Sequence, residues 1–373
     1  MNWLPRDGTT LNNNMKSCLY LVVLITILGS CPSCSKSGGG DSVTPVTDVL
    51  EIKAADLSFL PEVRASGLVI KNEAGQTEDM LQTLKNNGAT CIRLRLWKDP
   101  STATSSFNTV KALAQEIKNK GMKVWLSVHY SDTWADPGAQ VKPAAWTGLS
   151  FTQLKDSVYA YTQKIVSEIK PDYIQIGNEI NSGFLFPEGN LGNLNQLKEL
   201  LTAGTQAVRA NAPGCKIMLH CAGYAVADYF FTTLSAIDYD IMAVSYYPVW
   251  HGKDLGQLKT ALTNLCNSKN KPVVIAETAY PFTFGYNDFT NNIIGDNSQI
   301  ISNFPATNEG QKNFLLQLKS IVNDIPRGAG FCYWGAEWIS FYGPTATNGS
   351  SWENQALWGF DNKALPAISI FRD

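Results

Sequence analysis

Short apolar runs alternate with longer amphipathic stretches along most of this 373-residue chain. Apolar runs bounded by polar turns predict strands, whereas an apolar repeat of 3.6 residues predicts helices. Strands that are apolar throughout are typical of parallel sheets covered by helices. The expected strands are residues 54–59, 89–97, 122–128, 173–177, 216–220, 240–245, 272–276 and 328–334.

Helical patterns fill the intervals between these strands. They fall near residues 77–86, 108–120, 149–169, 194–210, just after 226, 255–266 and 310–322. Consecutive strand–helix units without hairpins predict a (β/α)₈ TIM barrel rather than an open doubly wound sheet. No glycine-rich phosphate fingerprint follows the first strand, which argues against a nucleotide enzyme.

The N-terminal pattern differs from the rest and indicates targeting. Lys16 precedes an apolar run over residues 19–28, which has the length of a signal-peptide core and is short for a membrane span. Met15 is the expected start, because residues 1–14 are polar. Leu28-Gly29-Ser30-Cys31 resembles the bacterial lipoprotein lipobox, which implies lipidation of Cys31. An ordinary cleaved signal peptide is the alternative.

The chain is therefore expected to have three parts. Residues 1–31 are an extension and lipoprotein signal peptide, residues 32–50 are a flexible tether rich in Gly, Ser, Thr and Pro, and residues 51–373 are one catalytic barrel. This division predicts an exported protein that touches the membrane only through its lipid anchor. We expect the cell envelope, at the outer membrane or surface of a Gram-negative bacterium. A cleft enzyme for a long polymer needs no partner subunit, so we expect a monomer.

Composition narrows the class of ligand. The formal net charge of −2 gives no electrostatic reason to bind nucleic acid or an anionic membrane. Ten Trp and fourteen Tyr, with only 17% charged residues, suit neutral ligands such as sugars, although aromatic side chains more often fill cores. The five cysteines beyond residue 50 lack metal-ligand spacing, and Cys91 and Cys332 lie in apolar strands as expected core residues.

Two predicted strands end on a glutamate. Glu179 closes Ile176-Gly177-Asn178-Glu179-Ile180, and Glu277 closes Val273-Val274-Ile275-Ala276-Glu277-Thr278. Barrel enzymes place their chemistry at the carboxyl ends of the strands. Two carboxyl groups over one pocket are what hydrolysis of a glycosidic bond requires. Ordinary surface salt bridges are the alternative, which the pair and the adjacent Asn178 make weaker.

Other strand ends add polar and aromatic residues to the same mouth. Arg93 and Arg95 share one face of their strand, and we expect Arg95, nearer the mouth, to support a catalytic glutamate. A tyrosine in Ser245-Tyr246-Tyr247-Pro248 would hydrogen-bond Glu277 and keep it ionised. The indole of Trp334 would form a floor for a pyranose ring. Core packing is the alternative for each aromatic residue.

Several strings are specific enough to compare with a known family. They are Arg93-Leu94-Arg95-Leu96-Trp97, His129-Tyr130-Ser131-Asp132-Thr133-Trp134-Ala135-Asp136-Pro137, Gly177-Asn178-Glu179-Ile180, Ser245-Tyr246-Tyr247-Pro248, and Tyr333-Trp334 with Trp338. From residue 54 onward the chain resembles glycoside hydrolase family 53, the endo-β-1,4-galactanases among the retaining glycosidases of clan A. The resemblance implies cleavage of β-1,4-galactosidic bonds in galactan or arabinogalactan, with no required cofactor.

The resemblance also implies roles for single residues. Glu179 would be the general acid/base, Glu277 the nucleophile, and Asn178 the partner of the sugar 2-OH in the −1 subsite. The residues that match the surroundings of that subsite, or fall in neighbouring loops as further substrate-binding candidates, are Arg95, His129, Tyr247 and Trp334, and then Asp132, Trp134 and Trp250.

The sequence departs from the family pattern in two places. Gly335-Ala336-Glu337 stands where many members have Glu-Pro-Ala, which affects the placement of Trp338. Bacterial members often carry an Asp/Gly-rich calcium loop after the seventh strand. The segment here has Asp288 and Asp296 without that pattern, so these two are the candidate ligands of a structural calcium. A solvated polar loop is the alternative.

A retaining mechanism predicts carboxyl groups about 5–5.5 Å apart, against about 6.5–9.5 Å for inversion. Glu179 would be kept neutral by the charge of Glu277, and Glu277 kept ionised by Arg95. The nearest alternative is the same chemistry on mannan or cellulose. A surface lipoprotein that binds glycans without cleaving them is a second alternative. A metallohydrolase is disfavoured, because three histidines without a cluster make a poor metal site.

Overall fold

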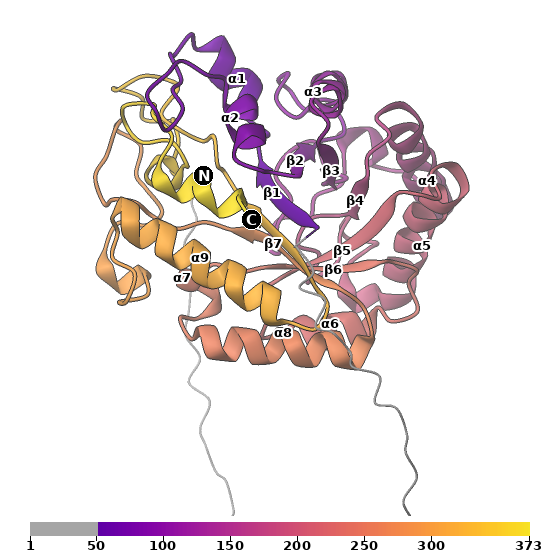
Figure 1. Cartoon of the computed structure of the whole chain (residues 1–373). Coiled ribbons are helices and arrows are strands. Elements are labelled where there is room, and N and C mark those ends of the chain that lie inside the picture. Colours follow the sequence, from indigo (N-terminus) through magenta and orange to yellow (C-terminus); the bar gives the residue numbers. More distant parts are fainter. Residues whose placement is uncertain (1–50) are drawn as a thin grey trace, which may run out of the picture. The chain divides into compact units, whose positions relative to one another are not determined.

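The structure is a computed structural model that describes residues 51–373, so the predicted signal peptide, Cys31 and the tether lie outside the described residues. Eight parallel strands close into one barrel in chain order, with helices on the outside, which confirms the predicted (β/α)₈ architecture (Figure 1). The strands are β1 (Ile52–Asp56), β2 (Cys91–Leu96), β3 (Lys123–Val128), β4 (Tyr173–Ile176), β5 (Lys216–Ala222), β6 (Ile241–Ser245), β7 (Val273–Thr278) and β8 (Gly328–Tyr333).

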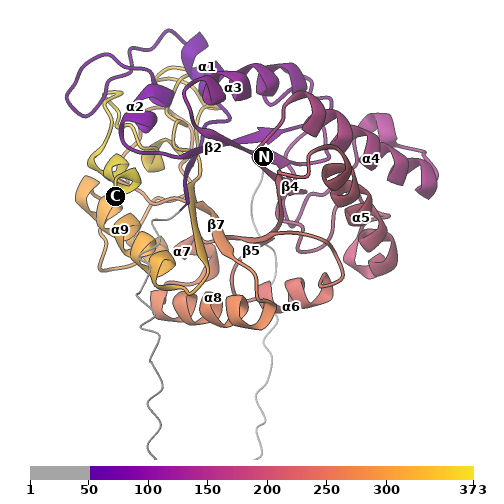
Figure 2. The same ribbon diagram turned by 45° about the vertical axis from the view of Figure 1, so that its right-hand side comes forward.

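The helices follow the predicted intervals closely. They are α1 (Leu60–Ala65), α2 (Met80–Asn86), α3 (Phe107–Asn119), α4 (Phe151–Glu168), α5 (Leu194–Asn211), α6 (Ala227–Thr233), α7 (Pro248–His251), α8 (Leu255–Lys269) and α9 (Asn308–Asp324). In Figure 2 they surround the strands, with α4 beside α5 and α8 beside α9. Side-chain caps fix the starts of several of them: Ser150 and Gln153 form a capping box on α4, and Asp254 caps α8. Within residues 51–373, the helices are too short or too polar to cross a membrane.

The barrel interior is layered by the two-residue repeat of the strands. Its lower part is apolar and includes Cys91, Trp125, Ala243 and Cys332, which confirms the two cysteines as core residues. Arg93 follows Cys91 by two residues along β2, and its guanidinium lies 5.7 Å from the Trp125 ring centre. Successive inward positions thus change from apolar to charged toward the mouth, because side chains two apart share one face. All five cysteines of the described chain are free and buried.

A β-bulge on β7 interrupts this repeat where the chemistry begins. Val244 of β6 pairs with Ile275, whereas the next residue, Ser245, pairs with Glu277, so Ala276 is an extra residue. Ala276 belongs to the interior apolar cluster. Regular alternation would then turn Glu277 outward; the bulge returns it to the inner face.

Candidate active site

Glu277 lies at the end of β7 and is held by two donors. Arg93 Nη2 donates to Oε1 at 2.7 Å, and the Tyr247 hydroxyl donates to Oε2 at 3.1 Å. The tyrosine contact predicted from sequence is therefore confirmed. Burial and the charge of Glu277 raise the pKa of Tyr247 well above its usual value, so this hydroxyl stays a donor.

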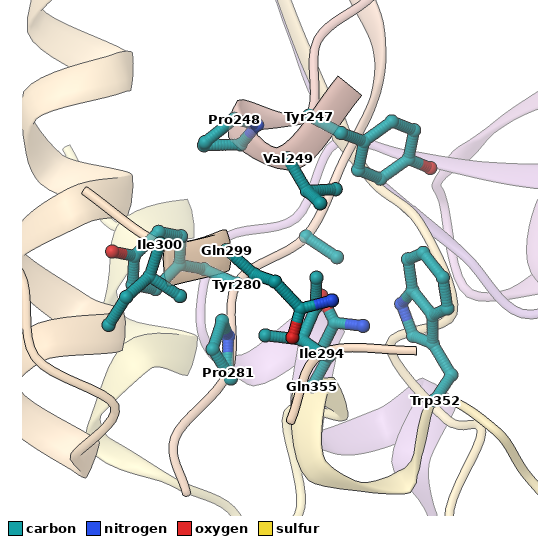
Figure 3. A pocket seen from close by; sticks show the side chains of 11 residues that line it. Tyr247, Pro248, Val249, Tyr280, Pro281, Ile294, Gln299, Ile300, Trp352 and Gln355 are labelled. Carbon is teal, nitrogen blue, oxygen red and sulfur yellow. The ribbon is translucent and has the colours of Figure 1, made fainter. Parts of the chain in front are cut away.

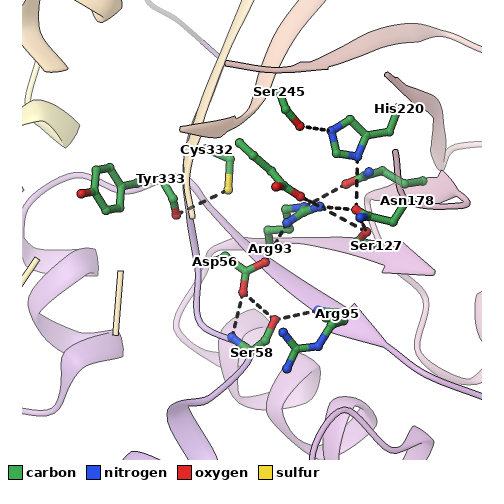
Figure 4. Close-up of polar contacts among 12 residues, drawn as sticks. Asp56, Ser58, Arg93, Arg95, Ser127, Asn178, His220, Ser245, Cys332 and Tyr333 are labelled. Carbon is green, nitrogen blue, oxygen red and sulfur yellow. Dashed lines mark hydrogen bonds and ion pairs between the residues drawn. The ribbon is translucent and has the colours of Figure 1, made fainter. Parts of the chain in front are cut away.

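Arg93, rather than Arg95, is the arginine beneath the glutamate. It is almost fully buried and is a hub for hydrogen bonds to five side chains (Figure 4). The acceptors are Asp56 Oδ2 (2.9 Å), Gln175 Oε1 (2.9 Å), Ser127 Oγ (3.2 Å), Asn178 Oδ1 (2.9 Å) and Glu277 Oε1 (2.7 Å). The nearby charges of Glu277 and Asp56 raise the pKa of this arginine although burial opposes them, so it stays positive.

The expectation that Arg95 keeps Glu277 ionised is wrong. Arg95 lies one inward position higher, where its Nε donates to Ser105 Oγ at 3.0 Å. Its guanidinium carbon lies over the rings of Phe59, Trp97 and Trp134, at 4.5, 4.6 and 3.9 Å from their centres. Burial lowers the pKa of Arg95 to about 10, and it remains a cation at neutral pH.

Glu179 follows β4 in a tight turn. Its backbone has φ +46° and that of Gly177 has φ +87°. A Cβ on Gly177 would lie 2.5 Å from Ile180 Cγ2, so this turn requires glycine. The Glu179 carboxylate accepts from Ser245 Oγ at 2.5 Å, and Ser245 in turn contacts His220 Nε2 at 2.8 Å.

The two glutamates come together as the sequence predicted. One carboxylate oxygen of Glu179, one of Glu277 and one ring nitrogen of His220 all lie within 4.8 Å of one another. This spacing is shorter than the separation of about 6.5–9.5 Å that leaves room for water in inverting enzymes.

The surroundings assign different protonation states to the pair. Burial, and then the charge of Glu277, raises the pKa of Glu179 to about 8. Burial also raises the pKa of Glu277, but Arg93 and the Tyr247 hydroxyl oppose that rise. Glu179 forms no ion pair among the described residues. A proton shared by the pair therefore rests on Glu179, and Glu277 is the anion.

Asn178 stands between the arginine and the acid. Its Oδ1 accepts from Arg93 and from Ser127 Oγ at 3.0 Å, and its Nδ2 donates to Ala135 O at 2.9 Å. An amide nitrogen carries two hydrogens, so one more donor bond is available to a ligand. This is compatible with the role toward a sugar hydroxyl that the family resemblance implies.

His129 and Asp132, which follow β3, accept hydrogen bonds from the backbone of nearby loops. His129 is buried, and its Nδ1 accepts from the Ala135 backbone at 3.0 Å. Burial lowers its pKa well below the usual value, so His129 is neutral. Asp132 accepts from the backbone nitrogens of Asp99 (2.9 Å) and Ala144 (2.8 Å). Both side chains therefore shape the mouth through backbone contacts, and their contact with a substrate stays a prediction.

Aromatic rings form a continuous surface beside the acid pair. Trp338 stacks on Phe59 with ring centres 4.7 Å apart and near Trp134 at 6.3 Å, both at an interplanar angle of 25°. Trp334 meets Trp338 edge to face at 5.6 Å. The Gly335-Ala336-Glu337 departure thus leaves Trp338 in contact with the predicted Trp134 and Trp334. Beneath them, the buried Glu337 carboxylate accepts from the Phe59 backbone at 2.6 Å.

A second aromatic group lies on the Tyr247 side. Trp250 is 49% exposed and stacks on Trp352, with ring centres 6.1 Å apart. Trp352 also meets Trp334 edge to face at 4.8 Å. A small, mainly apolar cavity lies behind Tyr247 and Trp352, and the Tyr247 hydroxyl points away from it (Figure 3). The cavity therefore lies behind the side chains of Tyr247 and Trp352, and neither Glu179 nor Glu277 lines it.

Sequence reasoning missed several of these residues. Arg93 is on the same strand face as Arg95 and was a candidate with it, but the sequence pattern does not show which of the two lies level with Glu277. His220 and Ser245 were placed at strand ends but given no partner. No sequence pattern indicated a role for Trp352, since it lies in a long segment after β8 without helical or strand periodicity.

The sequence model described as glycosyl hydrolase family 53 matches residues 52–371. The chain belongs to glycosyl hydrolase family 53.

Relatives across this family share most of the chain's length. The chain is 35% identical over 341 residues to an arabinogalactan endo-beta-1,4-galactanase of Cellvibrio japonicus, covering 85% of this chain and 89% of that protein. It is 32% identical over 342 residues to arabinogalactan endo-beta-1,4-galactanase A of Aspergillus niger, covering 87% and 95%. The solved GH53 catalytic domain of Ignisphaera aggregans superposes with a TM-score of 0.82 at 35% identity, covering 88% and 97%.

In this family 53 chain the carboxyl pair is not arranged as a metal site. Glu179, His220 and Glu277 are close enough to surround an ion, and no other group of three such residues does so within the described part of the chain. Their atoms are already engaged: Nε2 of His220 meets Ser245, and Glu277 pairs with Arg93. A guanidinium 2.7 Å from the carboxylate supplies the positive charge that a cation would bring.

Of the two calcium ligands predicted in the loop after β7, only Asp288 is placed where it could bind an ion. Asp288 is buried, and its Oδ2 accepts no hydrogen bond from the described residues. Its charge helps to raise the pKa of the buried Glu353, whose Oε2 is likewise without a donor, so the two carboxyl groups are neighbours. Asp296 instead caps a 3₁₀ turn (Asn297–Gln299) through Ser298 N. Asp288 and Glu353 are oxygen ligands of the type calcium prefers, and such an ion would tie the loops after β7 and β8 together.

Proposed function

We propose that this protein is an endo-β-1,4-galactanase that cleaves β-1,4-galactosidic bonds of galactan and arabinogalactan. The observation that carries the proposal is the pair of carboxyl groups within 4.8 Å, one paired with a buried arginine and the other not. Membership of family 53 and the printed activities of the Cellvibrio and Aspergillus relatives support the choice of galactan.

Two displacements at the anomeric carbon would perform the reaction. In the first, Glu277 Oε attacks the anomeric carbon of the −1 galactosyl unit while the glycosidic C–O bond breaks, and Glu179 gives its proton to the departing oxygen. In the second, Glu179 takes a proton from water, whose oxygen attacks the same carbon and releases Glu277. Two inversions give net retention. The separation of the carboxyl groups and the proton on Glu179 support this order of events.

Substrate contacts would come from the rings and the amide around the pair. Trp334 would support the −1 ring, and the free amide hydrogen of Asn178 would reach the 2-OH. Trp134 and Trp338 on one side and Trp250 on the other offer stacking surfaces for further sugar units. Rings on both sides of the pair favour attack within a chain rather than at its end.

Hydrolysis of linear β-1,4-galactan tests the proposal. We expect reducing ends to appear early as a mixture of oligosaccharides, with far slower release from mannan or carboxymethylcellulose. Preference for mannan or cellulose would assign the same chemistry to another polymer. Calorimetric binding of galactan without any product would instead favour a glycan-binding protein.

The envelope location is a further part of the proposal. The lipobox-like Leu28-Gly29-Ser30-Cys31 supports an acyl anchor on Cys31, with residues 32–50 as the tether. Labelling with a fatty-acid probe in a Gram-negative host should mark the wild type and not Cys31→Ala. Equal labelling of both would remove the anchor. A monomer by light scattering is expected, because both carboxyl groups come from one chain.

A further inference from the structure

Hydrogen bonds connect the proposed acid through Ser245 to His220. Glu179 Oε1 meets Ser245 Oγ at 2.5 Å, and Ser245 Oγ meets His220 Nε2 at 2.8 Å. His220 Nδ1 then faces two groups, Asn178 Oδ1 at 3.2 Å and the Glu179 backbone nitrogen at 3.3 Å. His220 and Ser245 face each other in Figure 4, and both are fully buried, so water does not complete their hydrogen bonds.

The contacts of His220 Nδ1 decide which ring nitrogen carries the proton. Asn178 Oδ1 already accepts from Arg93 and Ser127, which uses its two lone pairs. The Glu179 backbone N–H has no other acceptor among the described residues. Nδ1 is therefore the acceptor from that N–H, and the proton of the neutral ring is on Nε2. Burial, followed by the charge of Arg93, lowers the pKa of His220 well below its usual value, so the ring carries one proton only.

The direction of the remaining bonds follows. His220 Nε2–H donates to Ser245 Oγ, and the single hydrogen of Ser245 then donates to Glu179 Oε1. An oxygen that accepts this bond is the poorer place for the proton of the carboxylic acid. Glu179 Oε2 accepts no hydrogen bond from the described residues and is not among their buried unpaired atoms.

We infer that Ser245 and His220 are positioning residues that keep the acidic proton of Glu179 on Oε2, the oxygen open to the cleft. The backbone N–H of Glu179 fixes the tautomer of His220. His220 in turn orients the Ser245 hydroxyl toward the side chain of Glu179. The inference rests on the proposed acid/base role of Glu179. The ionisable groups facing Glu179 from other elements are Arg93, Asp136, His220, Cys221, Tyr247 and Glu277.

Ser245→Ala tests the inference through leaving groups. We expect kcat/KM on galactan, whose leaving oxygen needs a proton, to fall by about 10- to 100-fold, within the range of general acid catalysis. On a dinitrophenyl β-1,4-galactobioside, whose leaving group needs none, kcat/KM should change less than about threefold. Ser245→Thr keeps the hydroxyl and should restore most of the galactan activity. A purely structural defect would lower both substrates equally, and that result would overturn the inference.

The pH profile gives a second readout. Ionised Glu179 loses a donor in Ser245→Ala, so its pKa should rise, and the basic limb of kcat/KM on galactan should move to higher pH than in the wild type, where the pKa is about 8. An unchanged or lowered limb in a folded variant would contradict the predicted bond direction.

The tautomer can be read without any kinetic measurement. In ¹⁵N-histidine-labelled wild type, His220 should show a protonated Nε2 and an unprotonated Nδ1 at neutral pH, with His251→Gln used to assign one of the three histidine signals. A protonated Nδ1 would overturn the inference even if Ser245→Ala fails to fold. Wild-type protein without activity on galactan would instead remove the proposed function and leave the tautomer measurement standing.

Discussion

Arg93 and Arg95 are two residues apart on one strand, yet their surroundings and their roles differ. Arg93 lies among carboxylates and amides and donates to five side chains. Arg95 lies among three aromatic rings, donates through its side chain to one hydroxyl, and its buried Nη2 has no acceptor among the described residues. The first stabilises charge, and the second supports a stacking surface. Height along a strand therefore decides the role of an arginine as much as the face it occupies.

Arg93→Met should have the largest effect, because it removes the charge that two buried carboxylates share. Asp56 and Glu277 would be left without their cation, which costs about 3–5 kcal/mol of unfolding free energy. Hydrolysis of galactan should be lost as well. Urea denaturation measures the first effect. Arg93→Lys, which keeps the charge but not the planar set of donors, should recover part of the stability and little of the activity.

Glu277→Ala should separate chemistry from structure at the same network. We expect turnover of galactan to fall by more than about 10³-fold, as when a nucleophile is removed. Arg93 keeps its pair with Asp56, so folding and oligosaccharide binding should persist. Circular dichroism and calorimetry check both. Residual turnover near the wild-type rate would refute the assignment of the nucleophile.

Arg95→Met should affect substrate binding more than turnover. The variant loses a buried cation in contact with Phe59, Trp97 and Trp134, and loss of such desolvated cation–π contacts should cost about 2 kcal/mol of stability. The stacking surface would loosen, so KM for galactan should rise severalfold with kcat nearly constant. Arg95→Lys should lie between the two. A loss in kcat alone would show that the two arginines are not functionally distinct.

Glu179→Gln should remove one part of the pH dependence of stability. Folded Glu179 holds its proton up to a pKa of about 8, whereas the unfolded group ionises near 4.5. Its contribution to stability is thus complete below 4.5 and is lost as the pH rises toward 8. The variant should therefore lose less stability than the wild type between these limits. Parallel denaturation curves at several pH values test this difference, and identical slopes would contradict the raised pKa.

The sequence was enough to predict the barrel, since its strand and helix patterns alternate without interruption. It also indicated the glutamate pair and the Tyr247 contact, because strand ends of a parallel barrel meet at one mouth. It did not distinguish Arg93 from Arg95, because depth within a barrel depends on strand register. The partners of Ser245 and His220 depend on a turn at Glu179 that no periodic pattern encodes. The calcium candidate Asp296 was likewise chosen from proximity in sequence, whereas Glu353 comes from a distant segment.

The bulge at Ala276 matters for the engineering of barrel enzymes. A local irregularity of the backbone, rather than a residue type, turns the nucleophile inward: if β7 kept Ala276 facing the interior and continued with regular alternation, Glu277 would face the helices. A design that keeps an inward-facing residue directly before such a carboxylate would therefore need to copy the bulge along with the side chain.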